Sequence, residues 1–407
     1  MTPEQRAAEF DAADPLAGYR ERFVLPEGVI YCDGNSLGAL PKATPGALAR
    51  VVESEWGTGM IRSWNSAGWF DMAARIGGKI APLIGAQPHE VIACDSTSVN
   101  LFKLIAAALA LRPRRKVVLS EPGNFPTDLY MIAGLEAQGL ATRRLVEREA
   151  LAGALDGEVA LLLLTHAHYK TGALHDMAAL TRAAHEAGAL VLWDLSHSSG
   201  ALPVDLNGAG ADFAVGCGYK YLCGGPGAPA FAFVAERHQA ELQQPLTGWF
   251  GHAAPFAFSD DYAGAPGIER LQCGTPPVLG LAALEVGVDL IAEIGVDRLY
   301  EKSQALSEFF LESLMALGVS LELVSPPRAA ERGSQLSFRH PDAYAICQAL
   351  IARGVIGDFR APDVLRLGFA PAYLSFADMA AAARHLAEVL ASGEWQRPEF
   401  NQRAAVT

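Results

Sequence analysis

The sequence predicts an α/β protein with a large, mostly parallel sheet and a smaller α+β domain. Three observations carry this prediction. The middle of the chain alternates short apolar runs with segments in which apolar residues recur at helical spacing. The runs are apolar almost throughout, as in strands that helices cover on both faces. From Pro276 onward this alternation stops, and long helical stretches precede a few short strands.

Seven apolar runs predict the strands of the large sheet, at residues 90–94, 116–120, 139–146, 159–165, 189–194, 212–216 and 229–234. Helical spacing in the segments between them predicts helices at residues 99–111, 127–138 and 177–187. Repeated strand–helix–strand units with right-handed crossovers produce a mostly parallel sheet.

The C-terminal part of the sequence has a different pattern of expected helices and strands. Helices are expected at residues 278–294 and 296–317, strands at 319–324, 335–339 and 364–368, a loop at 325–328, and two further helices. We therefore expect residues 51–280 to form the large domain, and residues 1–50 together with 281–407 to form the small one.

Composition narrows the classes of function. The 407 residues are 51% hydrophobic and 19% charged, which excludes a disordered chain. The formal net charge of −13 argues against nucleic acid or an anionic membrane as a partner. The N-terminal residues contain no apolar run, so we expect no signal peptide. Six cysteines without a C-x-x-C pair predict reduced thiols in the cytoplasm and no zinc site.

Two polar residues follow strands of the predicted sheet. Asp194 ends the run 189–194, and Lys220 follows the run 212–216 just before a glycine-rich turn. Ligands of open α/β sheets bind at the carboxyl ends of the strands. The alternative interpretations are an acid that caps a loop and a lysine that extends to the surface.

Pyridoxal phosphate needs both of these residue types, a lysine for its Schiff base and an acid for its pyridine nitrogen. Thr97 and Ser98 lie between a strand and a helix, where backbone N–H groups and hydroxyls can bind a phosphate. Phe125 offers a ring for stacking, and Asp128 adds an acid. Each feature alone also suits an ordinary helix cap, but their order and their strand-end positions favour this cofactor.

Eight short segments between about residue 30 and about residue 376 carry a family resemblance: residues 31–38 (YCDGNSLG), 97–100 (TSVN), 125–128 (FPTD), 169–172 (YKTG), 194–197 (DLSH), 218–222 (GYKYL), 248–252 (GWFGH) and 274–277 (GTPP). In this order they resemble kynureninases, which are fold-type I pyridoxal-phosphate enzymes related to the cysteine desulfurases. The GYKYL and GWFGH segments are the most specific.

The resemblance implies a role for each matching residue. The catalytic group would consist of Lys220, Asp194 and Tyr219. The cofactor would be bound by these three and by Thr97, Ser98, Phe125, Thr127, Asp128, Thr165, His197, Trp249 and Thr275. The substrate would be bound by Arg366, which would hold its α-carboxylate, and by Ser36 and Trp64. Trp249 and Thr275 would reach across the two-fold axis of a homodimer.

The implied activity is hydrolysis of L-kynurenine, or of its 3-hydroxy form, to an anthranilate and L-alanine in tryptophan catabolism. A cysteine desulfurase-like lyase is one alternative. It is weakened because Cys347 lies in a predicted helix, 343–353, rather than in a mobile loop.

A metal-dependent hydrolase built on His166, His168 and His175 is a second alternative, and a non-catalytic dimeric scaffold that has kept the fold is a third. A His-x-His pair on a strand points both rings to one face, and relatives often have Asn at the second histidine. No further acid or histidine follows at a suitable strand end, so we expect no metal.

Overall fold

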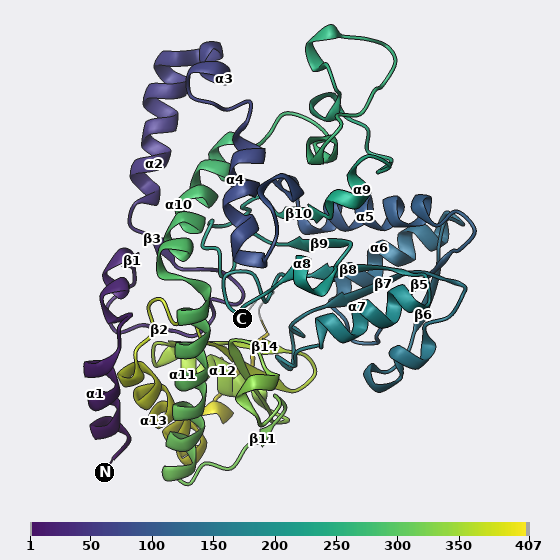
Figure 1. Ribbon diagram of the computed structural model, residues 1–407. Coiled ribbons are helices and arrows are strands. Elements are labelled where there is room, and N and C mark those ends of the chain that lie inside the picture. Colours follow the sequence, from purple (N-terminus) through teal and green to yellow (C-terminus); the bar gives the residue numbers. More distant parts are fainter. Residues whose placement is uncertain (1, 404–407) are drawn as a thin grey trace.

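A seven-stranded sheet forms the centre of the computed structural model, which describes residues 2–403 (Figure 1). In spatial order its strands are β4 (Val91–Ala93), β10 (Phe231–Val234), β9 (Phe213–Gly216), β8 (Leu190–Asp194), β7 (Val159–Thr165), β5 (Val117–Ser120) and β6 (Thr142–Leu145). β10 is antiparallel to β4 and β9, and the pairs from β9 to β6 are parallel. The predicted seven-stranded, mostly parallel sheet is confirmed.

Helices cover both faces of this sheet. α5 (Thr97–Leu111) and α6 (Pro126–Ala137) lie on one side, and α7 (Met177–Glu186) and α8 (Leu206–Ala209) lie on the other (Figure 1). Every residue of β7 and β8 is buried as a result. This burial is the physical reason for the continuous apolar runs in the sequence. The edge strand β6 is instead largely exposed and carries Arg143 and Arg144, which discourage pairing with another chain.

The C-terminal residues form a second, antiparallel sheet in the order β11 (Glu322–Leu323), β12 (Gln335–Arg339), β15 (Val364–Gly368) and β14 (Asp358–Arg360). The accompanying helices are α11 (Val296–Ala316), α12 (Ala343–Ala352) and α13 (Phe376–Ser392). β15 is an interior strand, and its register places Arg366 opposite both Ser337 and Asp358.

The N-terminal segment joins this smaller sheet. α1 (Pro3–Ala13) packs against α13, and β2 (Ile30–Tyr31) pairs in parallel with β13 (Val355–Ile356). β1 (Phe23–Val24) pairs with β3 (Leu40–Pro41) nearby. The sequence prediction missed β1, β2, β3, β13 and β14, because strands of two or three residues are too short to show a period.

Two long helices link the sheets. α10 (Val278–Ile294) packs against α2 (Thr44–Arg50) and α4 (Met72–Ile80), and α11 follows it at Gly295. We propose the division expected from the sequence, with residues 51–280 as the large domain. The pairing of β2 with β13 supports assigning the N-terminal residues to the small domain, whereas α10 contacts both parts.

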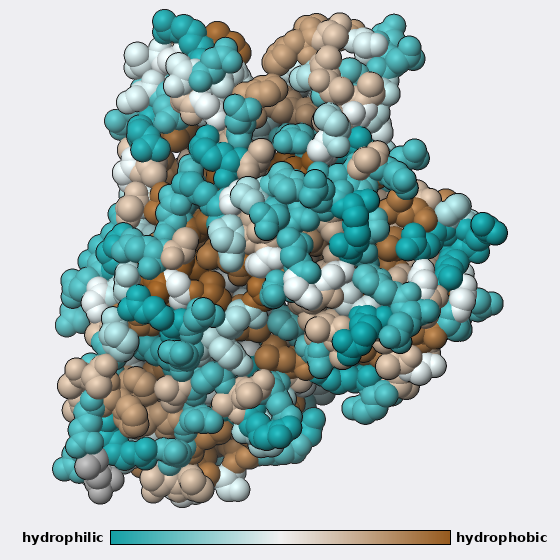
Figure 2. Space-filling view, viewed as in Figure 1, coloured by the Kyte–Doolittle hydropathy of each residue, from teal (hydrophilic) through white to brown (hydrophobic). Residues whose placement is uncertain are grey.

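Two protrusions rise from the large sheet at the top of Figure 1. One is formed by α2, the π-helical stretch Val51–Gly59 and α3 (Ser63–Ser66), and the other by the loop between α9 (Glu236–Gln239) and α10. Hydrophobic side chains gather between them in Figure 2. The exposed apolar residues of the two protrusions include Trp56, Met60, Ile61, Trp249, Phe256 and Phe258.

Candidate active site

Lys220 lies just beyond the end of β9 and is buried, with 7% of its surface exposed. Its Nζ is 3.0 Å from Nε2 of His197 and 5.6 Å from the centroid of the Phe125 ring. A surface lysine is therefore excluded. The Lys220 segment is held from the other side by Gly38, whose N–H donates a hydrogen bond of 2.8 Å to the carbonyl of Tyr219.

Two buried carboxyl groups lie next to this lysine. Asp194, at the end of β8, accepts a hydrogen bond of 2.7 Å from the N–H of Ser196. Asp128, on the first turn of α6, accepts one of 3.1 Å from the hydroxyl of Thr165. Burial raises the pKa of Asp194, and burial together with the charge of Asp194 raises the pKa of Asp128 well above its usual range. A positive charge placed beside them would favour their ionised forms.

The imidazole of His197 is the third buried group. Burial and the positive charge of Lys220 hold its pKa well below its usual range, so His197 is neutral. Its Nε2 can thus accept a hydrogen bond from the Lys220 ammonium group. Among residues 2–403, Nδ1 of His197 and Oδ1 of Asp128 have no hydrogen-bond partner although both are buried. Unpaired buried polar atoms are costly, and here they indicate a polar ligand.

Pyridoxal phosphate fits these residues. Lys220 offers a primary amine, Phe125 a ring face, and Asp194 an acid for the ring nitrogen. The unpaired atoms of His197 and Asp128 match the polar substituents of the cofactor ring. Thr97 and Ser98 lie on the first turn of α5, whose N-terminus suits a phosphate, and Thr127 lies on the first turn of α6.

The predicted substrate arginine lies on the interior strand β15 and is fully buried. Arg366 pairs with the carboxylate of Asp358 through Nε, at 2.8 Å, and through Nη2. Nη2 also donates to Oγ of Ser36 at 2.9 Å, and Nη1 donates to the carbonyl of Tyr169 at 2.6 Å. The structure thus brings Ser36 and Arg366 together. The ring centroids of Tyr169 and Phe125 are 5.3 Å apart. Because Phe125 also lies beside Nζ of Lys220, this contact links the Arg366 cluster to Lys220.

Three residues that were predicted to bind the cofactor or the substrate make their contacts outside the cluster around Lys220 and Arg366. Trp249 is 42% exposed and packs against Phe256 and Phe258, and Thr275 is exposed just before α10. Trp64 lies between Trp69 and Phe250, at centroid distances of 5.7 and 5.6 Å. Among residues 2–403, no hydrogen bond or ring contact joins these three side chains to Lys220 or Arg366.

The expectation that His166 and His168 lie on a strand with both rings on one face is wrong. β7 ends at Thr165, so both residues follow the strand. Nδ1 of His166 contacts Oγ of Ser198 at 2.9 Å, whereas Nε2 of His168 contacts the carbonyl of Gly123 at 2.9 Å. Within residues 2–403, no cluster of three or more His, Cys, Asp or Glu side chains is arranged to hold a metal ion.

The sequence analysis missed several residues of the site. Asn124 accepts a hydrogen bond of 2.6 Å from the hydroxyl of Thr165, and Asp358 pairs with Arg366. Asn124 directly precedes Phe125, so its place on the same turn was a usable signal. Asp358 and Arg360 belong to the short strand β14, which showed no pattern. Lys103 is fully buried and pairs with Asp95 at 2.5 Å, just before α5.

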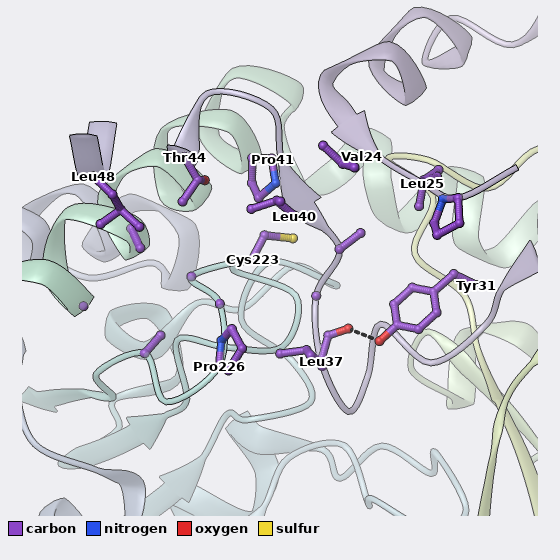
Figure 3. A pocket seen from close by; sticks show the side chains of 18 of the residues that line it. Val24, Leu25, Tyr31, Leu37, Leu40, Pro41, Thr44, Leu48, Cys223 and Pro226 are labelled. Atoms are coloured by element: carbon purple, nitrogen blue, oxygen red, sulfur yellow. Dashed lines mark hydrogen bonds between the residues drawn. The ribbon is translucent and has the colours of Figure 1, made fainter. Parts of the chain in front are cut away.

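A cavity of about 680 Å³ lies behind the turn that follows Lys220 (Figure 3). It is lined mostly by apolar residues of the N-terminal segment, the glycine-rich turn and α10, among them Leu37, Leu40, Cys223, Pro226 and Leu279. The hydroxyl of Tyr31 donates to the carbonyl of Leu37 at its edge, at 2.8 Å. The polar groups around Asp194 lie apart from this apolar cavity.

Comparison with known proteins decides the family. The chain is 50% identical over 417 residues to a kynureninase of Burkholderia mallei (strain SAVP1), with 100% of both chains covered. It is 48% identical over 416 residues to a kynureninase of Pseudomonas fluorescens, again with complete coverage of both. The chain belongs to the kynureninase family. The family model of the kynureninase C-terminal domain matches residues 299–386, which include Arg366.

Solved structures place this kynureninase-family chain in the fold of pyridoxal-phosphate enzymes. An apo cysteine desulfurase from Thermococcus onnurineus NA1 superimposes with a TM-score of 0.78 at 21% identity, covering 92% of this chain and 98% of the other. A C-DES variant with glycine covalently linked to its PLP cofactor superimposes with a TM-score of 0.77 at 18% identity, covering 90% and 98%. The fold-type I class expected from the sequence is confirmed.

The cysteines of the kynureninase-family chain do not favour desulfurase chemistry. All six are free; five of them, including Cys347 on α12, are buried, and Cys273 is partly exposed. The candidate considered from the sequence, Cys347, is thus inaccessible to a bound substrate. Together with the full-length identity to kynureninases, this does not favour the desulfurase alternative. No helix within residues 2–403 is long and apolar enough to cross a membrane.

Proposed function

We infer that this chain is a pyridoxal-phosphate enzyme that hydrolyses L-kynurenine to anthranilate and L-alanine. The full-length identity to kynureninases supports the reaction. The arrangement of Lys220 against Phe125, with Asp194 buried beside it, is the single observation that carries the choice of cofactor. The site residues named below are part of the same proposal.

When bound, pyridoxal phosphate supplies a conjugated cationic ring that stores the electrons released when a bond to the substrate α-carbon breaks. Asp194 holds the proton on the ring nitrogen, because a buried carboxylate beside that nitrogen disfavours its loss. Nζ of Lys220 takes the proton from the α-carbon. His197 accepts a hydrogen bond from the same Nζ and so orients it. Arg366 and Ser36 orient the substrate through its α-carboxylate.

The reaction itself is tested with the purified holoenzyme and L-kynurenine. We expect anthranilate and alanine in equal amounts, and little sulfide from L-cysteine. Borohydride reduction followed by peptide mapping should place the pyridoxyl label on Lys220. Lys103 is the internal control, because its side chain is also buried but pairs with Asp95. Label on Lys103, or alanine formed from cysteine but not from kynurenine, would overturn the assignment.

We propose that the active form is a cytoplasmic homodimer in which Trp249 and Thr275 complete the partner's cofactor site. The exposed aromatic residues of the 240–277 loop and the apolar cavity beside the Lys220 turn support this proposal, since large apolar surfaces mark interfaces. Six free cysteines are typical of a reducing compartment. Sedimentation at assay concentration tests the dimer, and a fully active monomer would contradict it.

A further inference from the structure

The donors of Arg366 are almost fully used within the protein. A guanidinium has five N–H groups. The N–H of Nε and one of Nη2 bind Asp358, the other of Nη2 binds Ser36, and one of Nη1 binds the carbonyl of Tyr169. One N–H of Nη1 remains. A single N–H cannot form the two parallel hydrogen bonds with which arginine holds a carboxylate most strongly.

A second arginine lies beside it. Arg360 is two residues after Asp358 on β14, so the two side chains share one face of the strand. Nη2 of Arg360 is 2.7 Å from Oδ2 of Asp358 and 3.1 Å from Oγ of Ser36, and Nη1 donates to its neighbour's carbonyl, that of Phe359. Within residues 2–403, its Nε–H and one N–H of Nη1 have no partner. Its side chain is 31% exposed, against 1% for Arg366.

When Asp33 is protonated, the charges of this cluster leave one positive charge uncompensated. Arg366 and Arg360 lower the pKa of Asp358, so this acid is ionised and cancels one arginine. Burial and the neighbouring Asp358 raise the pKa of Asp33 to about 7, so Asp33 is mainly protonated below that pH and adds a negative charge above it. The positive charge that remains in the protonated state matches the single α-carboxylate of an amino acid. Without Arg360, the pair of Arg366 and Asp358 would be neutral.

The charge of Arg360 also acts on groups near Lys220. The positive charges of Arg366 and Arg360 both lower the pKa of His197, which contacts Nζ of Lys220. Both also lower the pKa of Tyr169, against the larger effect of burial, and the Tyr169 ring touches Phe125. Hydrogen bonds and a ring contact thus connect Arg360, through Ser36, Arg366 and Tyr169, with Phe125.

We propose that Arg360 is a second substrate-binding arginine, which holds the α-carboxylate together with the remaining N–H of Arg366, while Asp358 orients both guanidinium groups. The proposal rests on the proposed function only in taking the substrate to be an α-amino acid. In this arrangement Arg360 supplies the net positive charge of the site, and the buried Arg366 fixes the position of the substrate α-carboxylate.

The test compares two ligands that differ only in the carboxylate. The Arg360→Gln holoenzyme is titrated with L-alanine and with ethylamine, which lacks the carboxylate, and binding is followed by the absorbance of the cofactor. We expect the Kd of L-alanine to rise on the order of 10- to 100-fold, as for the loss of a hydrogen bond to a charged group. The Kd of ethylamine should stay within about threefold of wild type. Arg360→Lys should recover part of the L-alanine affinity, because it retains the charge without the fork.

Arg339→Gln is the matched control. Arg339 lies on β12 of the same sheet, is 46% exposed and pairs with Glu322 and Asp363. Its loss removes one positive charge from the same domain and should change neither Kd. The proposal is overturned if Arg360→Gln binds L-alanine as wild type does, or if it weakens both ligands equally, which would indicate a structural role. Because L-alanine binding is measured directly, a failure to cleave kynurenine would refute the proposed reaction and leave this test intact.

Discussion

Gly38 is the position at which a single methyl group should disturb the active site without touching any catalytic side chain. Its N–H binds the carbonyl of Tyr219, and it packs directly against the backbone of the Lys220 turn. A Cβ atom at this position would overlap the carbonyl oxygen of Lys220 and lie 2.9 Å from Cα of Cys223. A carbon–oxygen contact needs about 3.3 Å, so in Gly38→Ala the two segments must separate by on the order of 1 Å.

The expected cost follows from that displacement. Overpacking of this kind destabilises by about 1–3 kcal/mol, and a catalytic group misplaced by 1 Å loses activity on the order of 100-fold. We would measure the free energy of unfolding in urea, the Kd of pyridoxal phosphate and kcat for L-kynurenine. Gly46→Ala is the control, because Gly46 lies exposed on α2 with no atom within 4 Å of its added Cβ. It should be neutral or slightly stabilising. Wild-type stability and kcat in Gly38→Ala would refute the reasoning.

Three further predictions concern ionisable groups. Asp194→Asn should fold and bind the cofactor but lose kcat on the order of 100-fold or more, because an amide cannot stabilise the protonated ring nitrogen; near-normal turnover would argue against this role. Burial lowers the pKa of His166 to about 4, so its contribution to the free energy of unfolding is present above pH 6.5 and is lost as the pH falls toward 4. The free energy of unfolding of His166→Gln should therefore fall less steeply than that of wild type as the pH is lowered from 6.5 to 4. Parallel plots of the two free energies against pH would contradict this. The pH dependence from Asp33 has the opposite sign, because its pKa is raised from 3.8 to about 7 and its contribution to the free energy of unfolding is lost as the pH rises. Asp33→Asn should therefore gain stability relative to wild type between pH 4 and pH 8. A stability difference that does not change with pH would count against the raised pKa.

Local pattern was sufficient to predict the large domain. Strands β7 and β8 are buried on both faces, so their sequences carry no polar residue before the strand end and could be recognised directly. The polar residues that follow such strands were then informative. In parallel strands the carboxyl ends share one edge of the sheet, which is why Asp194 and Lys220, 26 positions apart in sequence, could be predicted to meet.

Spacing gave no information where residues meet through the folding of separate segments. Thr165, Asp128 and Asn124 come from different elements, and their hydrogen bonds depend on how α6 packs beside β7. The two-residue strand β2 and its pairing with β13 place Ser36 against Arg366, across 330 residues of chain. The His-x-His pair shows the opposite error, because β7 ends at Thr165, three residues before His168.

The sequence by itself determined the sheet and the order of its strands along the chain, and it pointed to Lys220 and Asp194 as candidate cofactor residues. These inferences follow from burial periodicity and from residue types at strand ends, which are local properties, whereas the family followed from matching sequence segments. Only the tertiary structure decided that Asp358 pairs with both Arg366 and Arg360, and that Gly38 supports the Lys220 turn. Each of these depends on distances of a few ångströms between segments far apart in the chain, and a one-dimensional pattern does not encode such distances.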